Sequence, residues 1–193
     1  MYTMEFSEQN RELELIRKSI KGERSAFQEL YNQNSRWMFA VCLRYHKNQE
    51  DAEDVLQESF IQIYKNLSSF KFEGNFKGWM RRITVNCALA KFRTNKIDFV
   101  SLEEQFSEAN ENILDTSLMD EINAEELIYY INRLSQGRKQ VFLAYAVDGL
   151  KHKEIAEILG ISEGTSKSQL FDARKELINA IKNDLVNINP ISI

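Results

Sequence analysis

Residues 153–165 read KEIAEILGISEGT, and this stretch has the pattern of two helices joined by a tight turn. Gly160 stands where the first helix should end, a position that favours a left-handed backbone and therefore glycine. Ile161 supplies an apolar side chain to the turn, and Ser162 is a natural N-cap for the next helix. The stretch predicts a helix-turn-helix, and an ordinary helical hairpin with a capped turn is the alternative.

The helix that follows the turn has two different faces. At 100° per residue, one stripe contains Ser166, Leu170, Ala173 and Leu177, and we expect this stripe to face the domain core. A helix in the major groove contacts bases with the N-terminal part of its exposed face, while flanking basic side chains hold phosphates. The candidate DNA-contacting residues are therefore Ser162, Thr165, Lys167, Ser168, Phe171, Asp172, Arg174 and Lys175.

The composition favours helices over sheets. Among 193 residues there are seven glycines and a single proline, Pro190, which leaves little turn chemistry for a multi-stranded sheet. A hydrophobic content of 43% suits a folded chain. No apolar run approaches the roughly 18 residues that cross a bilayer, and the first ten residues do not resemble a secretory signal. We expect a cytoplasmic protein without membrane insertion of this chain.

The sequence shows no metal site and no catalytic constellation. Cys42 and Cys87 form no CxxC pair, and His46 and His152 do not complete a zinc ligand set. Both cysteines stand in apolar helical surroundings, so we expect small buried hydrophobic side chains in a reducing compartment. Without a nucleophile–base pair or metal cluster, we expect no metal, no cofactor and no enzymatic activity.

Charge is distributed unevenly along the chain. The formal net charge is −4, but residues 97–126 contain ten acidic residues and no lysine or arginine. The rest of the chain therefore carries 25 basic and 19 acidic residues, a net charge of +6. Residues 71–96 hold seven basic residues and one acidic residue, Glu73. A basic part, an acidic tether and a third segment indicate separate tasks on one chain.

The sequence predicts an all-α protein of two small helical domains joined by an acidic flexible linker. Helical patterns before residue 95 cover roughly 10–21, 24–33, 34–47, 49–68 and 77–93. Residues 97–120 are rich in Ser, Asn and acidic residues and show no sustained period, which is typical of a linker. Helical pattern resumes near Asp120 and continues to about Leu185. The expected domains are 10–96 and 121–186, and the second contains the helix-turn-helix.

The predicted helix over 49–68 is apolar on one side and acidic on the other. Its apolar face contains Ala52, Leu56, Phe60, Ile63 and Leu67, and its opposite face contains Asp51, Asp54, Glu58, Gln62 and Lys65. Such an acidic face is most often simply a solvated surface. Metal binding is a weaker alternative, because no histidine lies nearby and magnesium sites made of protein ligands alone are unusual.

Residues 70–83 read FKFEGNFKGWMRRI, a segment in which aromatic and basic residues alternate. Aromatic rings accept unstacked bases and basic side chains follow phosphates, so this composition suits single-stranded DNA. In the following helix Arg82, Asn86 and Arg93 share a narrow polar stripe that can meet a duplex edge. Alternatively, Phe76 and Trp79 are simply core residues. That interpretation does not explain the basic residues beside them in the segment.

These three patterns resemble bacterial sigma factors of the small extracytoplasmic-function type, in the sigma-70 family. The similarity covers roughly residues 23–95 and 121–182, and upstream of the helix-turn-helix it includes Leu134, Gly137, Val141, Phe142 and Gly149. Ser166 stands where family members usually have valine, and its hydroxyl can bond back to the Ser162 carbonyl. Gln169 and Asp172 stand where many members have arginine, so the promoter sequence cannot be carried over. Ser135 replaces a common proline, which we expect to affect only the start of the helix.

The resemblance implies a role for each pattern. The acidic face would dock on core RNA polymerase, through Asp51, Asp54, Val55, Gln57 and Glu58. The basic-aromatic segment would recognise and open the minus-10 element, with the loop from Lys71 to Asn75 receiving a flipped base. The residues implied at the minus-10 element are Lys71, Phe72, Glu73, Asn75, Phe76, Trp79, Arg82, Asn86 and Arg93. The C-terminal helix would recognise the minus-35 element.

Two functional hypotheses remain from the sequence. The first is a sigma factor that is a monomer when free and has core RNA polymerase, promoter DNA and an anti-sigma factor as partners. The alternative is an autonomous helix-turn-helix regulator with an N-terminal sensor or dimerisation domain. A sensor domain needs neither the basic-aromatic segment nor the acidic face, and this chain has both, which favours the first hypothesis.

Overall fold

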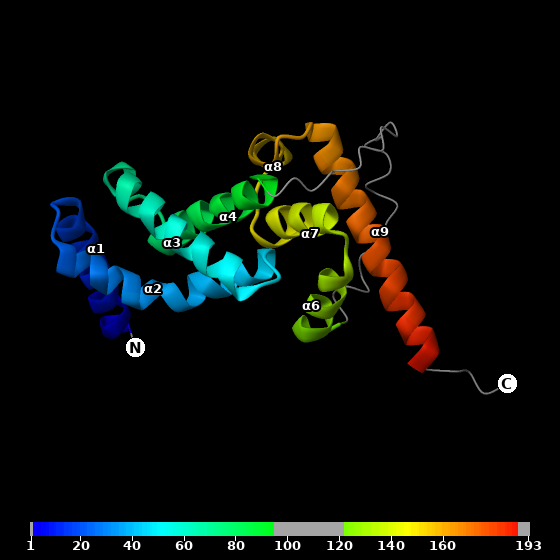
Figure 1. Ribbon diagram of the computed structural model, residues 1–193. Coiled ribbons are helices and arrows are strands. Elements are labelled where there is room, and N and C mark those ends of the chain that lie inside the picture. Colours follow the sequence, from blue (N-terminus) through cyan, green and yellow to red (C-terminus); the bar gives the residue numbers. More distant parts are fainter. Residues whose placement is uncertain (1, 95–121, 189–193) are drawn as a thin grey trace. The chain divides into compact units, whose positions relative to one another are not determined.

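A computed structural model describes residues 2–94 and 122–188, and all regular structure in these residues is helical (Figure 1). The first helices are α1 (Tyr2–Ile20), α2 (Arg24–Tyr45), α3 (Gln49–Asn66), the short 3₁₀ helix η1 (Leu67–Ser69) and α4 (Phe76–Thr94). The later helices are α6 (Ala124–Arg133), α7 (Gln136–Phe142), the π-helical segment η3 (Leu143–Val147), α8 (His152–Leu159) and α9 (Glu163–Ile188). The predicted all-α fold class is confirmed.

Contacts divide the chain into two compact units, Met1–Lys91 and Phe92–Ile193. The first, called unit 1 below, contains α1, α2, α3, η1 and most of α4, and the second, unit 2, contains α6 to α9. The expected linker, residues 97–120, lies outside the described residues, and so does Asp120. None of the described helices is long and apolar enough to span a membrane.

The apolar stripe of α3 organises unit 1. Helix α1 packs on α2, and α2 packs on α3. The predicted apolar stripe is buried along its whole length, so the acidic face of α3 points away from the core. The stripe consists of Ala52, Leu56, Phe60 and Ile63 of α3 and Leu67 of η1. Large side chains from the other helices complete this core, namely Ile16, Leu30, Met38, Tyr45, Met80 and Leu89.

Helix α2 is continuous, whereas the sequence predicts two helices, 24–33 and 34–47. Asn34 does not interrupt it because both ends of its side-chain amide are paired inside the helix. Nδ2 donates to the Leu30 carbonyl at 2.8 Å, and Oδ1 accepts from Trp37 Nε1 at 2.9 Å. The asparagine therefore does not compete for backbone groups in a way that ends a helix. The chain leaves helical geometry only at His46.

Helix α1 is an integral part of unit 1, and it begins at Tyr2 instead of near residue 10. Ile16 is fully buried, and the buried Ser19 hydroxyl donates to the Leu15 carbonyl at 2.8 Å. Arg11 pairs with Glu29 of α2. Gly22, with φ of +90°, allows the reversal between α1 and α2.

In unit 2, helices α6, α7 and α8 all pack on α9. The predicted stripe of Ser166, Leu170, Ala173 and Leu177 is buried, which confirms the expected orientation of this helix. Ile178 and Ile181 extend the buried stripe toward the C-terminus. The length of α9 thus lets one helix support all three neighbours.

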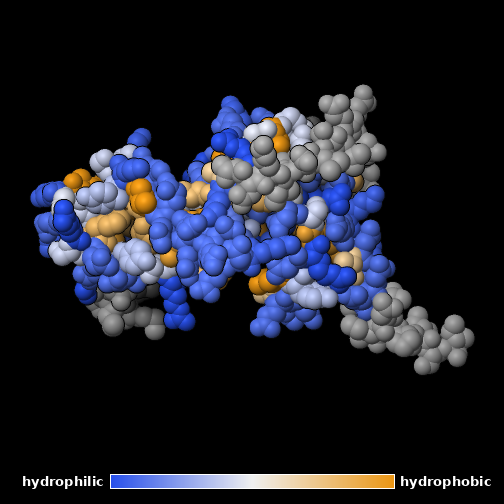
Figure 2. Space-filling view, in the orientation of Figure 1, coloured by the Kyte–Doolittle hydropathy of each residue, from blue (hydrophilic) through white to orange (hydrophobic). Residues whose placement is uncertain are grey.

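The visible surface is mostly hydrophilic, with separate apolar patches (Figure 2). The large apolar side chains exposed on unit 1 are Ile20, Leu43, Ile61, Tyr64 and Phe72. Single exposed apolar side chains are normal in soluble proteins. Phe72 is different because it belongs to the segment that the sequence associates with DNA.

We expect Ile16→Ala to lower the free energy of unfolding of unit 1 by about 2–5 kcal/mol, because it removes buried methyl groups and leaves a cavity. Both tryptophans, Trp37 and Trp79, lie in unit 1, so their fluorescence during urea unfolding reports on this unit. The matched control is Lys18→Ala on the same helix, expected within about 0.5 kcal/mol. Equal effects of the two changes would show that α1 is not part of the core.

Candidate functional sites

The turn between α8 and α9 has the geometry that the sequence predicts. Gly160 adopts a left-handed conformation with φ of +70°. The backbone N–H groups of Gly160 and Ile161 both donate to the Ala156 carbonyl, at 2.9 and 3.1 Å, and close α8. Ser162 Oγ accepts from the Thr165 N–H at 2.9 Å and caps α9. The predicted C-cap and N-cap are both confirmed.

A contact that sequence reasoning missed fixes the start of α9. The buried Ser166 hydroxyl lies 2.9 Å from His152 Nδ1 on α8, whereas the Ser162 carbonyl accepts the backbone N–H of Ser166 at 3.0 Å. The expected back-bond of the Ser166 hydroxyl is therefore replaced by a bond between helices. Tyr145 stacks on His152 with ring centroids 4.4 Å apart, and Arg174 lies over Tyr145 at 6.0 Å.

The residues predicted to face DNA differ in how firmly they are held. The Thr165 hydroxyl lies 2.9 Å from Ser162 Oγ, within hydrogen-bond distance. The Ser168 hydroxyl donates to the Thr165 carbonyl at 3.0 Å. Lys175 is exposed, and Lys167, Phe171 and Arg174 are partly exposed. The exposed face of α9 therefore presents basic side chains around short polar ones.

Asp172 is paired within unit 2. Arg138 of α7 donates from Nη2 to Asp172 Oδ2 at 3.3 Å and from Nη1 to Glu176 Oε2 at 2.7 Å. The guanidinium fork thus holds two carboxylates on successive turns of α9. Side-chain exposure of Asp172 is 33%, so its carboxylate is oriented by α7 while it remains partly accessible. Sequence spacing offers no signal for this pair.

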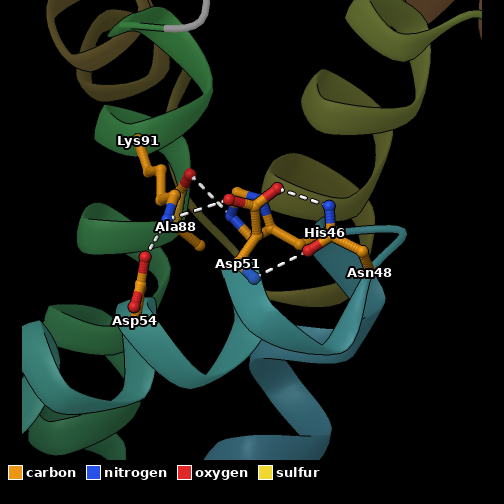
Figure 3. Close-up of polar contacts among 6 residues, drawn as sticks. All are labelled: His46, Asn48, Asp51, Asp54, Ala88 and Lys91. Atoms are coloured by element: carbon orange, nitrogen blue, oxygen red, sulfur yellow. Dashed lines mark hydrogen bonds and ion pairs between the residues drawn. The ribbon is translucent and has the colours of Figure 1, made fainter.

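The acidic face of α3 is also paired, and Figure 3 shows how. Lys91 Nζ of α4 lies 2.9 Å from Asp51 Oδ1 and 2.7 Å from Asp54 Oδ2. Asn48 caps the helix by accepting from the Asp51 N–H at 2.7 Å, and its Nδ2 donates to Asp51 Oδ2 at 2.8 Å. His46 Nε2 lies 3.2 Å from the Ala88 carbonyl and ties the end of α2 to α4.

These contacts set the protonation of the cluster. Hydrogen bonds from Lys91, and then from Asn48, lower the pKa of Asp51. Hydrogen bonds to Asp54 and Asp51 raise the pKa of Lys91. The Asp51 carboxylate and the Lys91 ammonium are therefore both charged at neutral pH, and the cluster is more ordered than the solvated surface that the sequence alone suggests.

The remaining residues of the predicted docking set fall on different sides of α3. Gln57 and Glu58 are exposed, and Glu58 Oε1 accepts from Gln62 at 2.7 Å. Val55 is only 1% exposed and belongs to the core. Its side chain supports α3 from inside and does not reach the exposed face of the helix.

The basic-aromatic segment forms a cavity of about 300 Å³, lined by Ser69, Phe70, Lys71, Glu73, Asn75 and Trp79. The centroid of the Phe70 ring lies 5.6 Å from that of Trp79 and 5.1 Å from that of Phe76, which is buried. Asn75 Oδ1 accepts from the Lys77 N–H at 2.8 Å and starts α4. The lining of the cavity therefore combines aromatic rings with polar and charged side chains.

The predicted polar stripe of α4 is only partly exposed. Arg82 and Arg93 are exposed, whereas Asn86 is partly buried. Within the described part of the chain, Asn86 Oδ1 is buried without a hydrogen-bond partner. An unsatisfied buried acceptor carries a desolvation cost of about 1–3 kcal/mol.

Neither cysteine is placed as a reactive group. Burial raises the pKa of the Cys42 thiol to about 12, and burial also raises the pKa of Cys87, which is partly exposed. Among residues 2–94 and 122–188, no group of three or more His, Cys, Asp or Glu side chains is arranged to hold a metal ion. The polar clusters on α3 and α9 consist of ion pairs and hydrogen bonds.

Two family models match the chain in order along the sequence. "Sigma-70 region 2" matches residues 30–97, which include the α3 cluster and the aromatic cavity. "Sigma-70, region 4" matches residues 124–177, which include the helix-turn-helix. The chain belongs to the sigma-70 family, in its extracytoplasmic-function group. Helix α1 lies before the first matched segment of this sigma factor.

Two known relatives are similar along nearly their whole length. The "ECF RNA polymerase sigma factor SigW" of Bacillus subtilis is 25% identical over 178 residues, 87% of this sigma factor and 95% of the relative. The "ECF RNA polymerase sigma-E factor" of Haemophilus influenzae is 29% identical over 187 residues, 91% and 98% of the two chains. A solved sigma factor RpoE, in complex with the anti-sigma factor NepR from Bartonella quintana, is 20% identical with a TM-score of 0.48, covering 81% and 96%.

We expect Lys91→Met to raise the pKa of Asp51 toward its ordinary value, because the mutation removes a donor that favours the carboxylate. An aspartate with a lowered folded-state pKa stabilises the fold above its unfolded pKa, about 3.9, and this contribution disappears as the pH falls through the folded pKa. The native protein should therefore have a higher free energy of unfolding than Lys91→Met at neutral pH, by at most about 1 kcal/mol for a surface pair. This difference should vanish in acid.

Titration of the Asp51 carboxyl carbon by NMR measures the pKa directly. Lys65→Met is the matched control, because Lys65 is an exposed residue of α3 and its removal should leave the pKa of Asp51 unchanged. An unchanged pKa in Lys91→Met would contradict the bridging role of this lysine.

Proposed function

We propose that this sigma factor binds core RNA polymerase, recognises the minus-35 and minus-10 promoter elements and promotes DNA opening. The observation that carries the proposal is the presence, in family order, of an aromatic-lined cavity beside a basic helix and a correctly capped helix-turn-helix. The proposed partners are core polymerase, promoter DNA and, as the family resemblance implies, an anti-sigma factor. The free chain acts as a monomer in the cytoplasm, without a catalytic step, metal or cofactor of its own.

Docking on core polymerase would use the outer face of α3. Asp54 has a side-chain exposure of 69%, and Gln57 and Glu58 are exposed beside it. Lys91 and Asn48 fix Asp51, so part of this face is ordered before a partner arrives. Pre-ordered polar groups lose less conformational entropy on binding, which supports this face as a docking surface.

Recognition of the minus-10 element would use the cavity and α4. The rings of Phe70 and Trp79 would provide stacking, and Lys71 and Glu73, which also line the cavity, would provide hydrogen bonds. Stacking combined with edge hydrogen bonds is how an unstacked base is recognised. Arg82 and Arg93 are exposed on α4 and would hold phosphates, and Asn86 lies on the same stripe.

Recognition of the minus-35 element would use the exposed face of α9. Ser162, Thr165 and Ser168 occupy its first turns, where a helix in the major groove approaches bases. Lys167, Arg174 and Lys175 flank this face and would contact phosphates. Asp172 would accept from a cytosine amino group, with its carboxylate oriented by Arg138.

The alternative, a self-sufficient helix-turn-helix regulator, differs in what it must bind. A sigma factor should bind core polymerase tightly and free duplex DNA poorly, whereas a regulator should do the reverse. In vitro transcription with purified core polymerase, followed by mapping of the start sites, separates the two. Tight specific binding to duplex DNA without polymerase, together with no transcription from a sigma-dependent template, would favour the regulator.

We expect Asp54→Asn combined with Glu58→Gln to weaken core binding about tenfold or more, since both substitutions remove charge from the proposed docking face. Because Asp54 also pairs with Lys91 on the surface, the double change should lower the stability of the protein by no more than about 1 kcal/mol. The control is Glu53→Gln, an exposed neighbour on α3 that pairs with Gln49 and lies outside the proposed set. Normal core binding by the folded double variant would contradict the docking surface.

We expect Lys167→Ala and Asp172→Ala to affect minus-35 binding in different ways. Loss of a phosphate contact should weaken binding to all sequences about equally and lower the magnitude of the log–log salt slope by about 0.9. Loss of a base contact should leave the slope nearly unchanged and reduce discrimination at one base pair by about 1–3 kcal/mol. Holoenzyme binding to a small promoter library across a salt series measures both quantities. A change of base preference in Lys167→Ala, with none in Asp172→Ala, would mean that α9 is oriented differently.

A further inference from the structure

One residue of the loop that borders the cavity has an unusual backbone conformation. Phe72 has φ of +57°, and it is the one non-glycine residue with positive φ in the described parts of the chain. Bulky side chains rarely adopt this region because the Cβ atom crowds the backbone. Such a conformation persists only where surrounding contacts hold it, and residues of this kind cluster at active sites, ligand clamps and switch regions.

Two contacts hold the Phe72 ring. The Arg17 guanidinium carbon lies 5.5 Å from the ring centroid, and the Phe70 ring lies 5.4 Å away. Phe70 in turn lines the cavity beside Trp79. Arg17 therefore connects, through Phe72 and Phe70, to the aromatic wall where an unstacked base would lie.

Arg17 is well placed to hold this loop. It lies in the last turn of α1, next to the fully buried Ile16. Helix α1 contacts η1, which leads directly into the loop. The two ends of the loop are fixed by η1 and α4. The contact of Arg17 with Phe72 restrains the middle of the loop, which η1 and α4 do not hold.

We propose that Arg17 is a positioning residue for promoter opening. Through its cation–π contact it holds Phe72, and with it the loop of residues 71–75, in the shape that keeps the cavity open for an extruded base. This role rests on the proposed function. It gives α1, which precedes the segment matched by the region 2 family model, a part in promoter opening. A direct contact between Arg17 and a DNA phosphate is the competing explanation.

The first experiment measures the loop in the free protein. Amide hydrogen exchange of residues 70–76 should be faster in Arg17→Ala than in the native chain. The matched control is Lys18→Ala, which removes a positive charge from the same turn of α1 but pairs with Glu14, and it should leave exchange in the loop unchanged. Unchanged exchange in Arg17→Ala would overturn the proposal.

The second experiment measures opening in the holoenzyme. Loss of an exposed cation–π contact changes an equilibrium constant by a factor of about two to five. Arg17→Ala should therefore reduce the yield of permanganate-reactive open complexes on duplex promoter by that factor. Core binding and transcription from a pre-melted bubble template should be normal, which a variant with a damaged fold would not show. Loss of transcription on both templates, or an undiminished yield of open complexes, would count against the positioning role.

A double mutant separates positioning from direct DNA contact. In a Phe72→Leu background, which keeps an apolar side chain but removes the ring, Arg17→Ala should cause no further loss of opening. An equal loss in both backgrounds would show that Arg17 acts on DNA directly and would overturn the proposal. If the native holoenzyme opens no promoter, the proposed function fails and the positioning role fails with it, while exchange rates still report whether Arg17 holds the loop.

Discussion

The burial of one apolar stripe on each of two helices determines which residues can act at a surface. In unit 1 the stripe of α3 includes Leu56, Phe60 and Ile63, and in unit 2 the stripe of α9 includes Leu170 and Leu177. Burial of each such large side chain contributes about 1.5–3 kcal/mol, whereas an exposed ion pair contributes at most about 1 kcal/mol. Apolar packing therefore sets the rotation of each helix, and the polar contacts form on the face that remains outside.

The parts of the fold that sequence reasoning predicted are those decided by local spacing. The Gly160 turn, the Ser162 cap and the two apolar stripes each depend on residues a few positions apart, so their periods can be read directly. The continuity of α2 was not predictable, because an asparagine usually favours an end or a turn. Only the pairing of Asn34 with Leu30 and Trp37 shows why the helix continues there.

The candidate sites were predictable in position but not in their internal partners. Lys91 lies 37 residues from Asp54, and Arg138 lies 34 residues from Asp172. Sequence periodicity carries no information on which side chains meet across helices at such separations. For the same reason, a motif-based list includes Val55 and Phe76, whose side chains the packing places in the core.

The candidate polymerase-binding surface on α3 and the candidate DNA-binding surface on α9 have the same arrangement of charges. On α3 one lysine holds two carboxylates, and on α9 one arginine holds two carboxylates. Each cluster of two carboxylates and one cation has a formal net charge of −1. A partner therefore meets carboxylates that are already held in place and partly neutralised. Binding there would exchange existing ion pairs for new ones, which contributes more to orientation and selectivity than to affinity. Affinity would then have to come from other features, such as the aromatic cavity of unit 1 and the phosphate contacts of both units.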